Sequence, residues 1–317
     1  MFDVVTLGHI LYDMRCYVDE FPKPDKTSFV KGRIKYSIGG SATNVACNLA
    51  KLGRRTCLIS KIGLDENGKY LMEELRKLGV CGDYVKVDKE KPSGVALLII
   101  NRQGEPILVE MVGANEPILP EEIPKDAIEN SRHLHMSGTN IEALDVASRI
   151  AKKLKKTVSF DPGRTKSQLG FKKLRKIFNR CDAIFFNKTE VCRVVGKEPF
   201  EDALQILKRK LKEKIIVIKR GKESTLLLSK KKNFTVSTVR VKVVDTIGAG
   251  DAFTAGFLHM FLSRKSLEEC VKFANVCGAL KVMNEGAMGL PPKEEVERFY
   301  MKKKDSMKVE RLWDWKK

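Results

Sequence analysis

The residues with the clearest capacity for chemistry lie in segment 244–257, which reads VDTIGAGDAFTAGF. The end of an apolar strand leads into Gly248, Ala249 and Gly250, and Asp251 then opens an amphipathic helix. Small residues allow backbone N–H groups to converge on an anion at the positive end of a helix. In the first helical turn, Asp251 would act as general base on a hydroxyl held beside a transferring phosphoryl group.

A purely structural alternative exists for this segment, in which Asp251 caps the helix and the glycines form a tight turn. That alternative would suffice for a bare Gly-x-Gly-Asp, whereas the complete DTIGAGD motif favours phosphate chemistry. The sequence contains no P-loop, no Gly-x-Gly-x-x-Gly after its first strand, and no HRD or DFG motif. These absences exclude a P-loop enzyme and leave a Rossmann dinucleotide site or a protein kinase without support.

The four histidines supply few ligands for a zinc site. His133 and His135 would face the same side of one strand, and we interpret them as structural rather than metal-binding residues. The eight cysteines form no CxxC pair, which is typical of reduced thiols in a cytoplasmic protein. No signal peptide or membrane-spanning segment is expected, because no apolar run reaches about 18 residues.

The elements that must position these residues alternate along the chain. Helical patterns separate apolar runs that predict strands at 2–7, 57–62, 132–136, 157–161, 183–187 and 215–219. Such alternation favours an α/β fold with a mostly parallel sheet flanked by helices. A helix is predicted after Gly39 and Gly40, with Ser41 as its N-cap and Gly53 just beyond its end.

Two segments do not follow the alternation, at about 12–37 and 93–115. We interpret them as strands of a small β-sheet lid on a single large domain that covers residues 1–300. Residues 301–317 carry seven basic and three acidic side chains. They predict either a frayed basic tail or an amphipathic helix that packs Leu312, Trp313 and Trp315.

The formal net charge of +20, from 60 basic and 40 acidic residues, is the feature that could indicate a nucleic-acid partner. Many basic residues recur at helical spacing among apolar ones, as in segments 151–156, 171–176 and 207–214. We interpret these as solvated outer faces of amphipathic helices, and we expect no nucleic-acid or membrane partner. The open alternative is a nucleic-acid-binding or regulatory protein built on the same scaffold.

Nearly the whole chain, from Val5 to Pro292, resembles the ribokinase-like carbohydrate kinases, also called the phosphofructokinase-B type. The matching motifs occur in the order of the family: GGSATN at 39–44, IGLDENG at 62–68, NKTE at 187–190, KRG at 219–221 and DTIGAGD at 245–251. The resemblance implies a doubly wound, ribokinase-like sheet and an ATP- and Mg²⁺-dependent kinase. Its acceptor would be a hydroxyl, usually a hydroxymethyl group, of a small sugar or sugar derivative.

The resemblance also implies roles for the phosphate side of the site. Asp251 would take the hydroxyl proton, and the amides of Gly248, Ala249 and Gly250 would hold the charge that develops on the transferred group. Glu190 would organise Mg²⁺ through water, a hard cation that prefers oxygen ligands. The nucleotide would be bound by Asn187, Lys219, Gly221 and Asn275. Asp245 and the carbonyl of Ile247 match positions that bind a monovalent cation such as K⁺ in some members.

On the acceptor side, the resemblance implies that Asp13 and Asn44 bind substrate hydroxyls, with Gly39 and Gly40 allowing close approach. Asp13 could accept two hydrogen bonds from a vicinal diol. Arg164 follows a predicted strand end, where it would approach phosphate or substrate or would simply be exposed in a turn. A nucleoside kinase of the same family is the alternative function. The lid could also mediate a homodimer, or close over a monomer.

Overall fold

The computed structural model describes residues 1–103 and 106–312. Its main sheet has 11 strands, and the side chains of successive strand residues face opposite sides of it. The strands lie in the order β15 (Val309–Arg311), β14 (Asn233–Ser237), β13 (Ser224–Leu228), β12 (Ile215–Lys219), β11 (Ala183–Asn187), β10 (Thr157–Asp161), β9 (Ser131–Ser137), β1 (Phe2–Gly8), β4 (Thr56–Gly63) and β5 (Val80–Cys81), with β6 (Val85–Asp88) also paired to β4.

Pairing is parallel from β12 to β5 and antiparallel from β12 to β15. The predicted mostly parallel sheet is therefore confirmed for its central part, to which β13, β14 and β15 add an antiparallel edge. The parallel arrangement has a direct consequence for function. The carboxyl ends of β10, β11 and β12 meet at one edge, where ligands of open α/β sheets usually bind.

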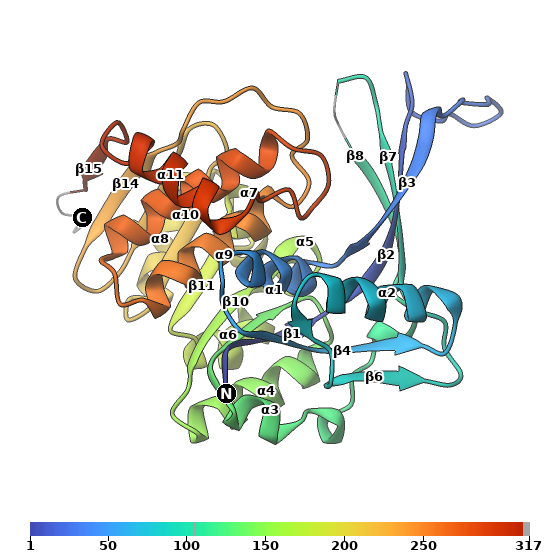
Figure 1. Ribbon diagram of the computed structural model, residues 1–317. Helices are drawn as coiled ribbons and strands as arrows, with labels where there is room; N and C mark the ends of the chain where they lie inside the picture. Colours follow the sequence, from blue (N-terminus) through green and yellow to red (C-terminus); the bar gives the residue numbers. More distant parts are fainter. Residues whose placement is uncertain (104–105, 313–317) are drawn as a thin grey trace.

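Helices cover both faces of this sheet (Figure 1). Phe185 of β11 faces one side and contacts Phe257, whereas Phe186 faces the other side and contacts Phe178. The first side carries α1 (Ser41–Lys51), α9 (Ala249–Leu262), α10 (Leu267–Val282) and α11 (Lys293–Lys303). The second side carries α3 (Lys125–Glu129), α4 (Ile141–Lys153), α6 (Gly170–Arg180), α7 (Lys188–Val195) and α8 (Phe200–Lys210).

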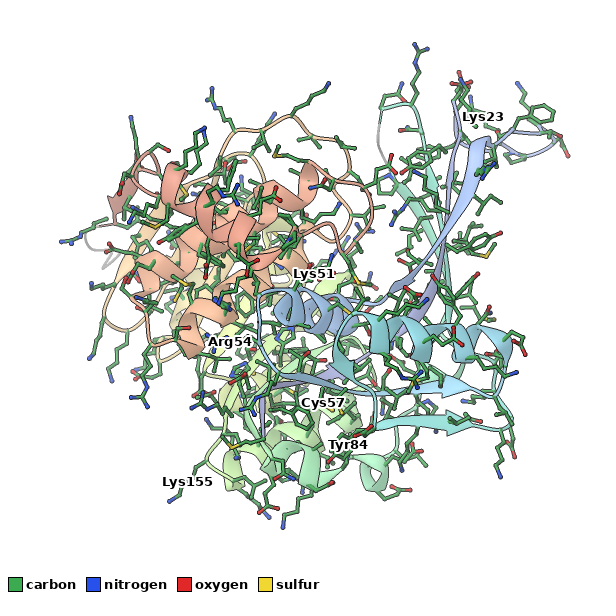
Figure 2. The ribbon with its side chains drawn as sticks, in the orientation of Figure 1. Lys23, Lys51, Arg54, Cys57, Tyr84 and Lys155 are labelled. Atoms are coloured by element: carbon green, nitrogen blue, oxygen red, sulfur yellow. The ribbon has the colours of Figure 1, made fainter. Side chains whose placement is uncertain are left out.

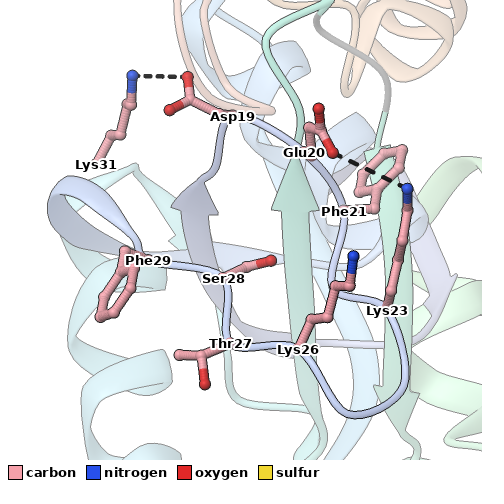
Figure 3. Close-up of a pocket in the computed structure, with 9 residues that line it drawn as sticks. All are labelled: Asp19, Glu20, Phe21, Lys23, Lys26, Thr27, Ser28, Phe29 and Lys31. Atoms are coloured by element: carbon pink, nitrogen blue, oxygen red, sulfur yellow. Dashed lines mark ion pairs between the residues drawn. The ribbon is translucent and has the colours of Figure 1, made fainter.

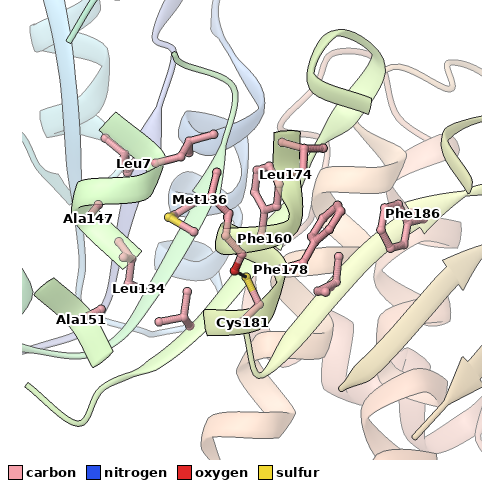
Figure 4. Close-up of a cluster of buried hydrophobic side chains, with 14 of the residues drawn as sticks. Leu7, Leu134, Met136, Ala147, Ala151, Phe160, Leu174, Phe178, Cys181 and Phe186 are labelled. Carbon is pink, nitrogen blue, oxygen red and sulfur yellow. Dashed lines mark hydrogen bonds between the residues drawn. The ribbon is translucent and has the colours of Figure 1, made fainter. Parts of the chain in front are cut away.

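The core on the second side is drawn in Figure 4, where Phe160, Leu174 and Phe178 pack together and the Cys181 thiol donates to the Ile177 carbonyl at 3.2 Å. The remaining helices are α2 (Glu66–Lys77), the short α5 (Gly163–Lys166) and the 3₁₀ turns η1 (Gly113–Asn115), η2 (Pro120–Glu122) and η3 (Ser167–Leu169). In the described residues, no helix has both the length and the apolar character needed to cross a membrane. The eight cysteines are all free.

A second sheet of four strands stands away from the body as the predicted lid (Figure 1). Its order is β3 (Lys31–Gly39), β2 (Leu11–Tyr17), β7 (Val95–Ile100) and β8 (Pro106–Met111). The β2 strand alternates between an inner face, which includes Asp13 and Arg15, and an outer face. The inner face packs on the body, since Leu11, Ala96 and Leu98 contact Ile247.

Two details differ from the sequence predictions. The N-cap of α1 is Gly40, with a φ of 94°, and Ser41 is the first helical residue, because its hydroxyl is engaged elsewhere. Residues 309–311 of the expected tail pair with β14 and extend the main sheet. Leu312 packs against the core, and Trp313 and Trp315 lie outside the described residues.

The basic residues of α6 lie on its solvent side, because Leu174, Ile177 and Phe178 occupy the buried side. Lys23 and Lys155 likewise project from the periphery of the molecule (Figure 2). This distribution agrees with the interpretation of such segments as outer helix faces.

Candidate active site

Asp251 lies in the first turn of α9, and its carboxylate is held from α1. The Ser41 hydroxyl donates to Oδ1 at 2.6 Å, and the Asn44 amide donates to Oδ2 at 2.8 Å. Burial raises the pKa of Asp251, and these two hydrogen bonds offset part of that effect. A buried carboxylate with a raised pKa is a stronger base than an exposed one, as proton abstraction near neutral pH requires.

The turn before α9 is the predicted anion site, and its backbone conformation requires glycine. Gly248 is left-handed, with a φ of 79°, and a Cβ there would lie 2.5 Å from the Ala287 carbonyl oxygen. The Ala249 amide donates to the Thr246 carbonyl at 3.2 Å, so it is engaged within the turn. In the described part of the chain, the amides of Gly250 and Asp251 form no such bond and remain at the positive end of the helix.

Three acidic groups and one ammonium group meet where β10, β11 and β12 end. Lys219, the last residue of β12, donates to Asp161 Oδ2 at 2.7 Å, and Asp161 is the last residue of β10. Burial lowers the pKa of Lys219, but the charges of Asp161, Glu190 and Asp251 outweigh burial and leave it raised. Lys219 is therefore cationic and lies beside the start of α9, 3.3 Å from the position of a Cβ on Gly250.

Glu190 forms a capping box at the start of α7. Its Oε2 accepts the Asn187 amide hydrogen at 2.8 Å, and Asn187 Oδ1 accepts that of Glu190 at 2.9 Å. Burial and the charge of Asp161 raise the pKa of Glu190 to about 7, although Lys219 lowers it in part. The carboxyl group therefore exchanges its proton near neutral pH and would bind a cation more strongly in its charged form.

Asp13 faces the same region from the lid. A Cβ on Gly39 would lie 2.2 Å from both of its carboxylate oxygens, so only glycine leaves room for this side chain. Burial raises the pKa of Asp13 to about 7, Arg15 lowers it, and Glu110 and Asp251 raise it. Asn44 has a buried Oδ1 without a hydrogen-bond partner in the described structure. A ligand that carries hydroxyl groups would satisfy both acceptors.

The other residues predicted to bind nucleotide or substrate lie in a turn, on the surface or inside the protein. Gly221 lies in the turn between β12 and β13 with a φ of 61°, and Arg164 is exposed in α5. Gly40 lies against the connection between β1 and β2, since a Cβ there would be 2.3 Å from the His9 carbonyl oxygen. Asn275 is engaged inside the protein, because its side chain bonds Thr225 Oγ1 at 2.7 Å and the Ser237 carbonyl at 3.1 Å.

Two residues of this cluster were not predicted from the sequence, Asp161 and Ser41. Asp161 could have been found as the polar residue at the end of an apolar strand, a position that points into ligand sites of α/β sheets. Ser41 gives no such signal, since its contact with Asp251 spans 210 positions of the chain. A third unpredicted group is His9, which lies 2.8 Å from Glu116 and 3.4 Å from Glu110.

Asp245, one of the two residues predicted to bind a monovalent cation, is already engaged by the protein. The carbonyl oxygen of Asp245 accepts a hydrogen bond from Lys281 at 2.6 Å, and Asp245 Oδ1 accepts one from the Ile247 amide at 2.9 Å. His133 and His135 are fully buried and bond Thr157 and Ser159, and burial lowers the pKa of each to about 3. Among the described residues, no group of three acidic, histidine or cysteine side chains could hold a metal ion.

A separate hollow lies at the tip of the lid, in the connection between β2 and β3 (Figure 3). Asp19 and Lys31 form an ion pair across it at 2.6 Å. Its lining residues, Asp19, Glu20, Phe21, Lys23, Lys26, Thr27, Ser28, Phe29 and Lys31, include none of the predicted site residues. The candidate active site is therefore the cluster between the lid and the carboxyl edge of the main sheet.

Comparisons with known proteins give relatives that match nearly the whole chain. Residues 1–294 match the family model described as pfkB family carbohydrate kinase. The chain is 31% identical to an ATP-dependent ribose-1-phosphate kinase of Halopiger xanaduensis, over 96% of this chain and 100% of that protein. It is 28% identical to a nucleoside kinase of Methanothermobacter thermautotrophicus, over 94% of this chain and 95% of that protein.

Solved structures share the fold. The structure of Arabidopsis thaliana ribokinase complexed with ribose and ATP superposes with a TM-score of 0.82 and 26% identity, covering 94% of this chain and 98% of that one. The lid and the main sheet together therefore form a ribokinase-like fold, as the sequence predicted.

The raised pKa of Asp13 can be measured directly. In protein labelled with ¹³C at aspartate carboxyl groups, we expect one resonance to titrate near pH 7, against an ordinary value of 3.8, because burial disfavours the charged form. The group is neutral below this pH and charged above it. The Asp13→Asn variant identifies the resonance by its loss, and a midpoint below about 5 would contradict the proposed environment.

Proposed function

The chain belongs to the pfkB family of carbohydrate kinases, and on this basis we propose that it transfers the γ-phosphoryl group of ATP to a hydroxymethyl hydroxyl of a small sugar or sugar derivative. The observation that carries this proposal is the Asp251 carboxylate. It is partly buried at the start of α9, it accepts hydrogen bonds from Ser41 and Asn44, and it lies beside the Asn44 Oδ1, which has no hydrogen-bond partner in the described structure.

In the proposed reaction, Asp251 accepts the proton of the acceptor hydroxyl. The oxygen forms a bond to the γ-phosphorus, the bond from that phosphorus to its bridging oxygen breaks, and ADP leaves with the electron pair. The amides of Gly250 and Asp251, with the predicted amide of Gly248, would stabilise charge on the transferred group, whereas the Ala249 amide, also predicted for this role, is engaged by the Thr246 carbonyl. Lys219 supplies a fixed positive charge at the same place, so positioning and electrostatics provide most of the catalysis.

The acidic residues fit a magnesium ion bound with the nucleotide. Mg²⁺ prefers oxygen ligands and keeps several waters, so one or two protein carboxylates suffice beside the phosphates. Glu190 and its neighbour Asp161 offer oxygen donors of this kind, with Asn187 holding Glu190 in place. When bound, the ion would neutralise phosphate charge. Gly221 and Arg164 are proposed to contact the nucleotide or substrate, and Asn275 to position the nucleotide cleft through its contacts with β13 and β14.

For the acceptor, we propose a ribosyl compound as the first class to test. Asp13 and Asn44 Oδ1 provide acceptors for hydroxyl groups, with Gly39 and Gly40 allowing close approach. The names of the relatives reported above share a ribose unit, free, 1-phosphorylated or carrying a base. A nucleoside kinase is therefore the second candidate function. The group at C1 of the ribose separates the candidates, since a hydroxyl or phosphate indicates a sugar kinase and a base indicates a nucleoside kinase.

A screen of acceptors tests the proposal. We expect nucleotide consumption with at least one of ribose, ribose 1-phosphate, nucleosides, hexoses, keto-sugar acids or inositol. The Asp251→Asn protein should turn over about 10²–10⁴-fold more slowly, because an amide cannot accept the proton. Circular dichroism and nucleotide binding should remain close to wild type, since the amide preserves the shape of the side chain.

The matched control is Asp305→Asn, which removes an exposed carboxylate far along the chain and should leave turnover unchanged. Near wild-type turnover of Asp251→Asn on the best acceptor would show that Asp251 is not the general base. Turnover of none of these acceptors, together with tight duplex binding that falls steeply with salt, would favour the nucleic-acid alternative.

The outer face of the lid suggests a homodimer. Tyr36, Val109 and Met111 expose 50%, 56% and 47% of their surface, and β8 is an edge strand that pairs only with β7 in the described lid sheet. We expect sedimentation velocity to give about twice the chain mass of 35.8 kDa. Val109→Lys should shift the protein toward monomer, whereas Val87→Lys on β6, at 51% exposure, should not. A monomeric wild-type protein at micromolar concentration would refute this assembly.

A further inference from the structure

Lys281 is a fully buried lysine near the end of α10, with 0% of its surface exposed. Its Nζ donates to the carbonyl oxygen of Asp245 at 2.6 Å and lies 3.6 Å from Asp245 Oδ2. A buried ammonium group is costly unless it is paired and hydrogen-bonded. Asp245 provides both kinds of partner, so Lys281 remains cationic at neutral pH beside the first residue of the DTIGAGD segment, although burial lowers its pKa to about 8.

The remaining oxygen atoms of Asp245 are also occupied. Oδ1 accepts the Ile247 amide hydrogen at 2.9 Å, and Oδ2 accepts that of Gly286 at 2.9 Å. The Arg15 guanidinium, from the lid, lies 3.9 Å from Oδ2. Two protein cations therefore approach this one residue, and each of its oxygen atoms already accepts a hydrogen bond.

This arrangement does not fit a bound K⁺ ion at Asp245. An ion such as K⁺ exchanges its water shell for several oxygen atoms, commonly backbone carbonyls. Here the carbonyl of Asp245 is used by an ammonium group, and a third cation beside Lys281 and Arg15 would be repelled. A protein group, the Lys281 ammonium, therefore fills the role of the monovalent cation predicted at Asp245 and Ile247.

A second lysine binds carbonyls of the neighbouring loop in the same way. Lys51, labelled in Figure 2, donates from Nζ to the carbonyl oxygens of Met288 and Leu290 at 2.6 and 3.1 Å. The loop after α10 contacts the start of α9, since Ala287 restricts position 248 to glycine. Ammonium groups thus bond carbonyl oxygens at Asp245 and in the loop that contacts the predicted anion site.

We propose that the Lys281 ammonium group takes the place of the monovalent cation, so that this protein catalyses phosphoryl transfer without K⁺. The inference rests on the proposed kinase function and specifies its ion requirement. Lys281 acts as a positioning residue: it fixes the Asp245 carbonyl and thereby the turn that carries Gly248, Gly250 and Asp251. It does not contact the reacting atoms.

The first experiment uses the wild-type protein in chloride salts of K⁺, Na⁺ and tetramethylammonium at equal ionic strength. We expect phosphorylation rates to agree within about twofold, because no cation site is open at Asp245. The melting temperature should also be the same in the three salts, since a ligand raises it only by binding the folded protein. A specific rise in rate or melting temperature with K⁺ would overturn the proposal.

The second experiment removes the ammonium group. Lys281→Ala should lose at least about tenfold in rate in tetramethylammonium, and K⁺ should restore a part of that rate and raise the melting temperature. Lys281→Gln, which keeps a hydrogen-bond donor without charge, replaces it if the alanine variant fails to fold. Lys302→Met, at an exposed position of α11, is the control and should show no response to K⁺.

Restoration by K⁺ separates the proposed role from a merely structural one, which a small ion would not restore. Full activity of Lys281→Ala without K⁺, or a loss that K⁺ does not relieve, would overturn the proposal. If the wild-type protein phosphorylates no acceptor, the kinase function fails. The melting temperatures then still decide the cation site, because they require no turnover.

Discussion

The structure of the active site depends on the burial of several carboxylates around one ammonium group. Asp161, Glu190 and Asp251 all influence Lys219, whose Nζ bonds Asp161 directly. Carboxylates this close cannot all ionise without cost, and burial and the charge of Asp161 raise the pKa of both Glu190 and Asp251. The base and the oxygen ligand for a cation that we propose would both arise from this single electrostatic constraint.

The fold creates this constraint through topology. Parallel strands bring the ends of β10 and β12 to one edge, so Asp161 and Lys219 meet although 58 positions separate them. The start of α9 adds Asp251, and α1 closes the cluster with Ser41 and Asn44. The lid strand β2 contributes Asp13 to the acceptor side and Arg15 to Asp245. A displacement of the lid would therefore alter the surroundings of two acidic groups at once.

Sequence patterns predicted the strands of the central sheet because short segments rich in apolar residues alternate along the chain with helical patterns. They also predicted the DTIGAGD turn, whose glycines have a local reason in the left-handed backbone of Gly248. Ser41 was taken for a helix cap, since a hydroxyl before a helix is normally used locally. Its partner, Asp251, is distant in sequence. The Asp245 carbonyl is likewise distant from Lys281, and no local sequence pattern predicts such pairs.

The net charge of +20 has little bearing on this site, because burial rather than number decides what a basic residue does. The exposed lysines of α6 are screened by solvent and influence one another weakly. Lys281 is fully buried and Lys219 is largely buried, and each ammonium group bonds one specific oxygen atom, of Asp245 and of Asp161 respectively. Removing one exposed lysine changes the total charge as much as removing Lys281 does, yet Lys281 also bonds the carbonyl of Asp245, at the start of the segment that leads to Asp251. The role that we propose for Lys281 therefore follows from its position and not from the net charge.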